Sequence, residues 1–156
     1  MEVALTAAGL AAALVAGVFL GFSDFVMRGL AQADGNTGAT GMVGLNRTVY
    51  RSVFMVLLMG LAPAAAVLSA VALAWLDGSA LVLTLAGAAA YLAGVMAVTG
   101  LGNVPMNTRL DRLSRTTGGA GEYWAEYVRG WTRLNHIRVA GSVFAAVAWI
   151  TAGYLA

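Results

Sequence analysis

Four long apolar stretches dominate the pattern of hydrophobic and polar positions along this chain. Val3 to Phe22 and Val139 to Ala156 carry no charge, and two further uncharged stretches cover 52–76 and 79–101. A helix needs about 20 residues to cross the hydrocarbon core of a bilayer, so the pattern indicates an all-α integral membrane protein. The predicted bundle of four spanning helices forms a single domain, 1–156, with spans at about 3–28, 50–76, 79–104 and 134–156.

The first span carries small residues at every fourth position. Such a ridge lets helix backbones approach closely in lipid, and we expect that contact inside the bundle, with a dimer interface as the less favoured alternative. The span continues directly into polar residues without a cleavage site, which favours a retained helix over a signal peptide. The ridge consists of Gly9, Ala13, Gly17 and Gly21.

Turn signals separate the spans. Asp77-Gly78 leaves so little chain between the second and third spans that they must form an antiparallel hairpin. Asp34-Gly35-Asn36 predicts a turn in the first long loop, and Thr117-Gly118-Gly119 predicts a break in the second. Pro63 lies within the second span and predicts a kink there.

The segment before the last span is amphipathic. Aromatic residues recur three and four positions apart on one side and charged residues lie on the other, which is typical of a helix lying in the headgroup region. The sequence therefore predicts an interfacial amphipathic helix before the last span. Its aromatic side is Tyr123, Trp124, Tyr127 and Trp131, and its polar side is Glu122, Glu126 and Arg129.

Composition supports the membrane assignment and excludes several classes of site. Hydrophobic residues make up 60% of the 156 residues and charged residues 10%, which is far from a soluble globular composition. The absence of cysteine excludes disulfides and thiolate sites, and the single histidine argues against a zinc site of the usual kind. The net charge of +2 comes from arginines near helix ends and is no sign of nucleic-acid binding.

The arginines predict an orientation. All nine basic residues are arginine, and all lie in the two long loops or at the adjoining helix ends. The positive-inside rule then places both long loops in the cytoplasm and both termini outside. We expect a multi-pass protein of the bacterial inner membrane.

Each span brings polar side chains to the same cytoplasmic level. Such groups at the mouth of membrane segments are costly to place and suggest a functional site. The alternative is that the arginines reach toward lipid headgroups and Trp131 sits at the interface. The set comprises Ser23, Asp24, Arg28, Asn46, Arg47, Arg51, Asn103, Asn107, Arg109, Asn135, His136 and Arg138.

One face of the last helix combines several of these groups. Trp131, Asn135, Arg138 and Ser142 are spaced i, i+4, i+7 and i+11, and amide and guanidinium donors there could stabilise a developing oxyanion. Arg138 on such a face needs a partner, for which Asp24 and Glu126 are the candidates in the sequence.

His136 is the side chain best suited to proton transfer near neutral pH. The alternative is that it makes structural hydrogen bonds. Asp24 could orient it, or could form an ion pair with Arg28 at i+4. A metal held by Glu122, Glu126, His136 and Asp24 is a weaker hypothesis, because the spacing is not diagnostic, and a solvated helix face is favoured for the glutamates. No dinucleotide, phosphate-loop or serine-nucleophile motif occurs.

Four motifs, in order along nearly the whole chain, carry a resemblance to a known family. They are FSDFVM from Phe22, LNRTVYRSVFM from Leu45, GNVPMN from Gly102 and WAEYVRGWTRLNHIR from Trp124. With the four spans, these motifs resemble the anthrone oxygenase family. Fungal members of that family oxidise anthrones to anthraquinones, and most bacterial relatives have no assigned reaction.

The resemblance implies a membrane-embedded, cofactor-independent oxygenase that uses O2 as co-substrate. A base would remove a proton from the acidic methylene of an anthrone-like, polycyclic substrate, and the carbanion would react with O2. The resemblance implies His136 as base, with Asn135 and Asn107 bonded to the enolate oxygen and Arg138 offsetting its charge. Asp24 departs from the family pattern, in which this position need not be acidic, and would tune His136 if it faces the site. It also implies that Trp131 and Trp124 pack on the flat rings of the substrate. Further candidate substrate-binding residues are Tyr127, Asn103, Asn46 and Arg51.

Two alternatives stay open at this point. The first is a non-catalytic membrane module that binds a lipid, a quinone or a partner subunit. The second, less favoured, is a metal or haem protein with His136 as ligand. The sequence also leaves open whether the protein forms a homo-oligomer.

Overall fold

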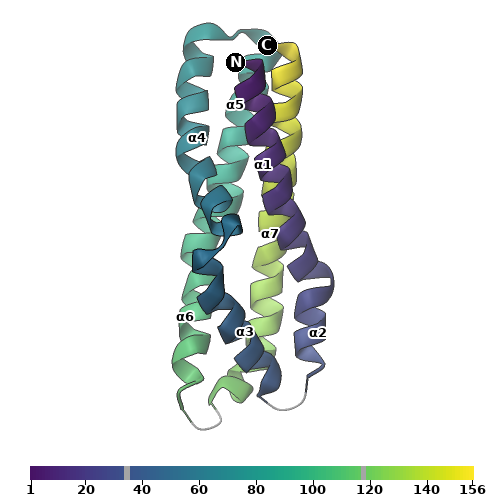
Figure 1. Ribbon diagram of the computed structural model, residues 1–156, viewed down its shortest axis with the longest axis vertical. Coiled ribbons are helices and arrows are strands. Elements are labelled where there is room, and N and C mark those ends of the chain that lie inside the picture. Colours follow the sequence, from purple (N-terminus) through teal and green to yellow (C-terminus); the bar gives the residue numbers. More distant parts are fainter. Residues whose placement is uncertain (34–35, 117–118) are drawn as a thin grey trace.

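The computed structural model describes residues 1–33, 36–116 and 119–156, and within them every regular element is a helix. Four helical rods lie side by side, with both termini at one end of the bundle (Figure 1). These rods are long and apolar enough to cross a membrane. The prediction of an all-α bundle with four spanning helices is therefore confirmed.

Each rod is built from one or more of the elements labelled in Figure 1. The first rod joins α1 (Glu2–Gly21), a π-helical turn η1 (Phe22–Val26) and α2 (Met27–Ala31). The second joins α3 (Thr37–Thr48), a 3₁₀ turn η2 (Val49–Arg51) and α4 (Val53–Trp75). The third joins α5 (Gly78–Ala89), the π-helical segments η3 (Ala90–Ala97) and η4 (Thr99–Asn103), and α6 (Val104–Leu113). The fourth is the single helix α7 (Gly119–Leu155).

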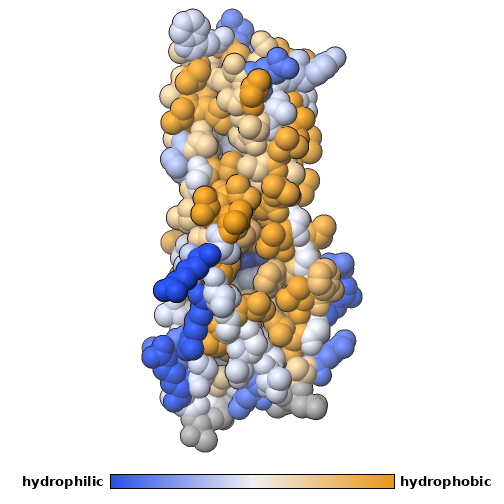
Figure 2. Space-filling model, in the orientation of Figure 1, coloured by the Kyte–Doolittle hydropathy of each residue, from blue (hydrophilic) through white to orange (hydrophobic). Residues whose placement is uncertain are grey.

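The rods are longer than a bilayer requires. At 1.5 Å per residue, α7 is roughly 55 Å long, against about 30 Å of hydrocarbon core. On the face shown in Figure 2, apolar side chains gather in the upper and middle parts, and the strongly hydrophilic ones gather in the lower half. The half of the bundle near α2, α3 and α6 therefore extends out of the hydrocarbon.

Each half of the bundle has its own core. The core of the membrane half includes Leu5, Val15, Leu58, Tyr91 and Trp149. The core of the other half is richer in methionine and aromatic residues. It consists of Met27, Ala39, Met42, Val43, Leu110, Ala120, Tyr123, Trp124, Tyr127 and Trp131.

The expected interfacial helix differs from the observed structure. The amphipathic segment is the first part of α7, which continues without a break into the last span. Tyr123, Tyr127 and Trp131 are buried, and they pack in the same core as Met42 of α3 and Leu110 of α6. The aromatic side faces protein because α3 and α6 pack against it. The sequence suggested that this region was mainly loop.

The small-residue ridge on α1 makes less internal contact than expected. Gly9 is buried against α7, where an added Cβ would lie 2.5 Å from Ile150 Cγ1. Ala13 and Gly17, however, are exposed, because α1 packs through a different face that includes Leu5, Ala12 and Val15. The expected internal contact is therefore present at Gly9 and absent at Ala13 and Gly17.

The turn signals have different outcomes. The hairpin at Asp77-Gly78 is confirmed, and Gly78 has φ of +54°, a left-handed conformation that favours glycine. Pro63 lies inside α4, which continues as one helix from Val53 to Trp75. The expected turn at Asp34-Gly35 and the break at Thr117-Gly118 lie outside the described residues.

Candidate functional site

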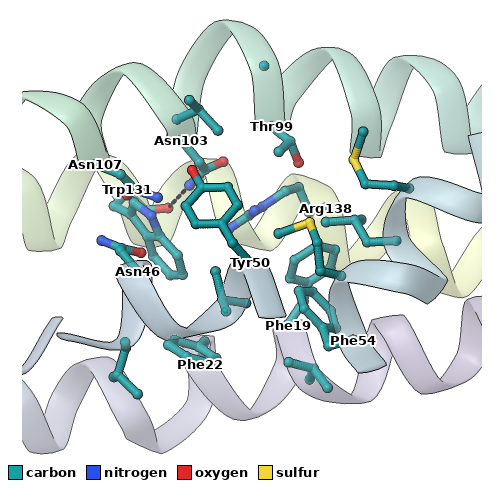
Figure 3. Close-up of a pocket in the computed structure, with 18 of the residues that line it drawn as sticks. Phe19, Phe22, Asn46, Tyr50, Phe54, Thr99, Asn103, Asn107, Trp131 and Arg138 are labelled. Atoms are coloured by element: carbon teal, nitrogen blue, oxygen red, sulfur yellow. Dashed lines mark hydrogen bonds between the residues drawn. The ribbon is translucent and has the colours of Figure 1, made fainter. Parts of the chain in front are cut away.

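A cavity of about 340 Å³ lies where the two halves of the bundle meet, and all four rods contribute to its wall. Its apolar part is formed mainly by phenylalanine, methionine and leucine side chains from both halves. Asn46 and Asn107 come from α3 and α6, and Arg138 lies against Phe19 of the membrane half. The labelled wall residues in Figure 3 are Phe19, Phe22, Asn46, Tyr50, Phe54, Thr99, Asn103, Asn107, Trp131 and Arg138.

Irregular helical segments surround this cavity. The π-helical turns η1 and η4 contribute Phe22, Thr99 and Asn103 to the wall, and π-helical turns are rare and often found at functional sites. The second rod breaks at Ser52, whose side chain caps α4 by accepting a hydrogen bond from the Met55 amide at 3.2 Å. Wall residues occur on both sides of that break, so the rods are not regular at the level of the cavity.

Arg138 is the central charged group of the site. It is 5% exposed, and its Nη2 donates to Asn135 Oδ1 at 2.7 Å. The guanidinium lies over the rings of Phe19 and Trp131, at 4.3 and 5.0 Å from their centroids. Figure 3 shows it between the asparagine side chains and the rings of Phe19 and Phe54.

Within the described part of the chain, no carboxylate pairs with Arg138, and its Nε has no hydrogen-bond partner. The expected partners are used elsewhere: Asp24 pairs with Arg28 at 2.8 Å and Glu126 with Arg109 at 3.1 Å. Both carboxylates are exposed on the outer surface and form ion pairs there, whereas Arg138 is buried. The expectation that one of them neutralises Arg138 was therefore wrong. Because buried charges are normally paired, this guanidinium has unused capacity for an anion.

Asn135 holds Arg138 in position from the side that faces away from the cavity. It is fully buried, and its Nδ2 donates to the Phe19 carbonyl at 2.6 Å and to Ser23 Oγ at 2.7 Å. Its Oδ1 accepts from Arg138. Asn135 therefore ties α7 to the first rod and holds the guanidinium, but it does not line the cavity.

Three further buried polar atoms at the wall have no partner among the described residues: Thr99 Oγ1, Asn103 Oδ1 and Trp131 Nε1. Asn103 is held in place because its Nδ2 donates to the Trp131 carbonyl at 3.2 Å. Unpaired buried polar atoms are uncommon in native proteins and call for an explanation. A ligand with oxygen or hydroxyl groups would satisfy them.

A second network fixes the polar end of the cavity. The Tyr127 hydroxyl donates to Asn107 Oδ1 at 2.7 Å and accepts from Asn46 Nδ2 at 3.4 Å. Trp124 stacks on Tyr127 with ring centroids 5.6 Å apart. Asn46 and Asn107 line the cavity, whereas Tyr127 and Trp124 lie behind it and support them.

The remaining predicted site residues lie outside this cavity. His136 is exposed and lines a groove elsewhere on α7, Asp24 is exposed in its pair with Arg28, and Arg51 is exposed. Successive residues of an α-helix turn by about 100°, so His136 is turned away from the face that carries Asn135 and Arg138. That face is buried as predicted, with Trp131 and Ser142 included.

Sequence reasoning missed most of the apolar wall and two of its polar residues; examples are Phe19, Phe22, Tyr50, Phe54 and Thr99. For Thr99 a signal existed, because Thr99, Asn103 and Asn107 recur at every fourth position of the third rod. The aromatic residues gave no signal, since one aromatic in an apolar span resembles any other.

The acidic residues considered for a metal site do not come together. Among residues 1–33, 36–116 and 119–156, no three His, Cys, Asp or Glu side chains are grouped so that they could hold a metal ion. Glu122, Glu126, His136 and Asp24 therefore do not form the cluster that the sequence left open.

Comparison with known proteins gives one match. Residues 46–148 match the family described as Anthrone oxygenase. No curated protein and no solved structure matches significantly. The matched region begins at Asn46 and includes Asn103, Asn107, Trp131 and Arg138.

Proposed function

Because the chain belongs to the anthrone oxygenase family, we propose that it is a membrane-embedded oxygenase acting on a hydrophobic polycyclic phenol or anthrone-type substrate with O2. The cavity supports this proposal by its two-part lining. Phe19, Phe54 and neighbouring methionines offer an apolar surface for flat rings, and asparagine side chains offer hydrogen bonds to an oxygen.

The observation that carries the proposal is the buried Arg138 guanidinium, which lines an otherwise largely apolar cavity without a carboxylate partner in the described residues. A preorganised cation in a site that excludes water stabilises negative charge more strongly than it would in water. An anthrone that loses its methylene proton becomes an enolate with charge on oxygen. Arg138 would bind that oxygen, and Asn103 and Asn107 lie at the same wall.

The proposed reaction converts the methylene group of the substrate and O2 into a ketone and water. One methylene C–H loses its proton, and the resulting carbanion adds to O2 and takes up a proton to give a hydroperoxide. The second C–H then loses its proton while the O–O bond breaks, so that the carbon becomes C=O and the outer oxygen leaves as water. In this scheme the protein contributes binding, orientation and charge stabilisation, without a resident cofactor.

The lining of the cavity restricts the choice of proton acceptor. None of the described wall residues is a histidine or a carboxylate, and His136, the base implied by the resemblance, lies outside it. We therefore infer that Arg138 acts by favouring the ionised form of the substrate, and we assign no side chain of the described wall as the base.

We also propose an orientation and a route to the site. The protein lies in the bacterial inner membrane with both termini outside and the end that holds α2, α3 and α6 in the cytoplasm, as the arginine distribution predicts. The cavity then lies near the cytoplasmic boundary. Its wall includes exposed residues such as Tyr50 and Met59, so a hydrophobic substrate can reach it from the bilayer or its interface.

The test is oxygen uptake by the detergent-purified full-length protein with a simple anthrone, above the spontaneous background. We expect Arg138→Met to lower kcat/KM by about 100-fold or more, as for loss of an oxyanion donor. Thermal stability should change little, because removal of an unpaired buried charge offsets the loss of its hydrogen bond to Asn135 Oδ1. Arg112→Met, which removes an exposed arginine outside the cavity, is the matched control.

The outcomes separate the oxygenase from the binding-module alternative. Uptake that disappears in Arg138→Met and persists in Arg112→Met supports the oxygenase. Background uptake in all three proteins, with Arg138-dependent binding of a phenol or quinone, would replace it by a non-catalytic module that uses the same cavity. Equal activity of Arg138→Met and wild type would overturn the assigned role of Arg138.

A further inference from the structure

A second concave surface lies between the first rod and α7, away from the catalytic cavity. This groove has a volume of about 380 Å³ and shares no wall residue with the cavity. Basic side chains surround it: Arg28, Arg129, Arg133 and His136. The oxygenase chemistry proposed above does not use this groove.

The groove carries excess positive charge. Arg28 is paired with Asp24, but in the part of the chain that the structure describes neither Arg129 nor Arg133 forms an ion pair. Glu126, the other carboxylate near this part of α7, pairs with Arg109 instead. An anion entering the groove would therefore meet two arginines whose charge is not offset.

The groove also contains an unused hydrogen-bonding group. Thr132 lies between Arg129 and Arg133 in sequence and lines the groove, and its buried hydroxyl has no hydrogen-bond partner among the described residues. Beside it the wall is apolar, with Met27 and Val128. The surface thus combines guanidinium donors, a hydroxyl donor and a hydrophobic flank.

Its depth relative to the bilayer follows from the uncharged spans. Val3 to Phe22 and Val139 to Ala156 would each cover about 27–30 Å at the helical rise, which matches the hydrocarbon core. Arg28 and Arg133 lie further along the same rods, roughly 9 Å beyond the ends of those spans at the helical rise. The groove therefore lies at the level of the lipid headgroups, in the leaflet nearer the long loops.

We propose that this groove binds the phosphate of an anionic phospholipid. Guanidinium groups bind phosphate oxygens through paired, charge-assisted hydrogen bonds, and basic pockets between membrane helices recognise anionic headgroups. Arg129 and Arg133 hold the phosphate, the Thr132 hydroxyl donates to it, and the flank at Met27 and Val128 contacts the start of the acyl chains. The residues differ from those of the catalytic cavity, so this proposal does not depend on the oxygenase reaction.

The experiment is native mass spectrometry of the full-length protein in detergent, titrated separately with phosphatidylglycerol, phosphatidylcholine and inorganic phosphate. We expect phosphatidylglycerol to bind at least about tenfold more tightly than phosphatidylcholine, because juxtamembrane arginines favour anionic lipid. Arg129→Gln/Arg133→Gln should lose that preference. Arg51→Gln/Arg112→Gln removes the same charge from exposed positions outside the groove and should keep it.

A third variant guards against misfolding. Thr132→Val keeps the shape of the side chain and removes the hydroxyl, so we expect severalfold weaker phosphatidylglycerol binding with an unchanged melting temperature. Equal loss in the two double variants would show a response to net charge alone and overturn the site. Inorganic phosphate that competes as well as the lipid would replace the lipid by a free anion, and unaltered lipid binding in the groove variants would also refute the proposal.

Discussion

At the scale of residues, the contrast between Arg138 and His136 defines the chemistry. The two lie two positions apart, yet Arg138 is buried at the cavity wall and His136 is exposed in the groove. Helical geometry explains this, because a step of two residues turns the side chain by about 200°. Proximity in sequence to a motif therefore did not decide which side chain meets a substrate.

We expect His136→Ala to keep kcat/KM for anthrone oxidation within about threefold of wild type, a change of less than 1 kcal/mol in transition-state stabilisation. The reason is that His136 does not line the cavity. Steady-state oxygen uptake of this variant beside Arg138→Met checks it. Loss of turnover in His136→Ala with the fold intact would instead support His136 as the base that the family resemblance implies.

Tyr127 has a supporting role at the polar end of the cavity. Tyr127→Phe removes the hydroxyl that donates to Asn107 Oδ1, and a buried hydrogen bond of this kind contributes about 1 kcal/mol. We expect a lower melting temperature and a higher KM, because Asn107 loses its fixed orientation. Tyr154→Phe, at an 88% exposed position, is the control and should change neither quantity.

The predictability of the site differs from residue to residue. Asn46, Asn103, Asn107 and Arg138 could be predicted as site residues from their polar character at the ends of apolar spans, and the structure brings them to one cavity. Asp24 and Arg51 satisfy the same criterion and lie outside it, because the sequence places a residue at a depth without showing which way it faces.

At the scale of elements, close helix packing depends on a few glycines rather than on the most regular ridge. A Cβ on Gly94 would lie 3.2 Å from Gly141 Cα, so η3 and α7 approach closely there. A Cβ on Gly87 would lie 2.7 Å from Trp149 Nε1, which donates to the Thr84 carbonyl. On α1, in contrast, nothing described lies within 4 Å of a Cβ added to Gly17.

This difference gives a matched pair of substitutions. Gly87→Ala should destabilise the protein by about 1–3 kcal/mol through overpacking against Trp149. Gly17→Ala should be neutral or stabilise it by about 0.5–1 kcal/mol through lower backbone entropy in the unfolded chain. Thermal unfolding of both variants in one detergent, followed by circular dichroism, checks the order. Equal destabilisation would show that the exposed ridge makes a contact of its own.

At the scale of the whole molecule, the bundle consists of a membrane half and a half that extends beyond the hydrocarbon, with the cavity at their junction. Phe19 and Phe54 belong to the first part of the wall and Asn46 and Asn107 to the second. A substrate with a flat apolar body and an ionisable oxygen fits this division. Because only one half of the bundle lies in the hydrocarbon, the protein has a fixed orientation across the membrane.

Single cysteines test that orientation, since the chain contains none of its own. Ser79 and Ser114 are exposed at opposite ends of the bundle. A membrane-impermeant maleimide should label Ser79→Cys in intact cells and Ser114→Cys only after the membrane is permeabilised, because the arginine-rich loops face the cytoplasm. The reverse labelling pattern would contradict the proposed topology.

The sequence by itself determined the number of spans, the hairpin at Asp77-Gly78 and the level at which polar groups gather. Bilayer thickness explains this, because it sets the length of every uncharged stretch. Only the tertiary structure decided that α7 is continuous, that Arg138 is left without a carboxylate partner among the described residues, and that His136 lies outside the cavity. Spacing fixes the angle between two side chains on one helix, whereas the rotation of that helix against its neighbours depends on packing along its whole length.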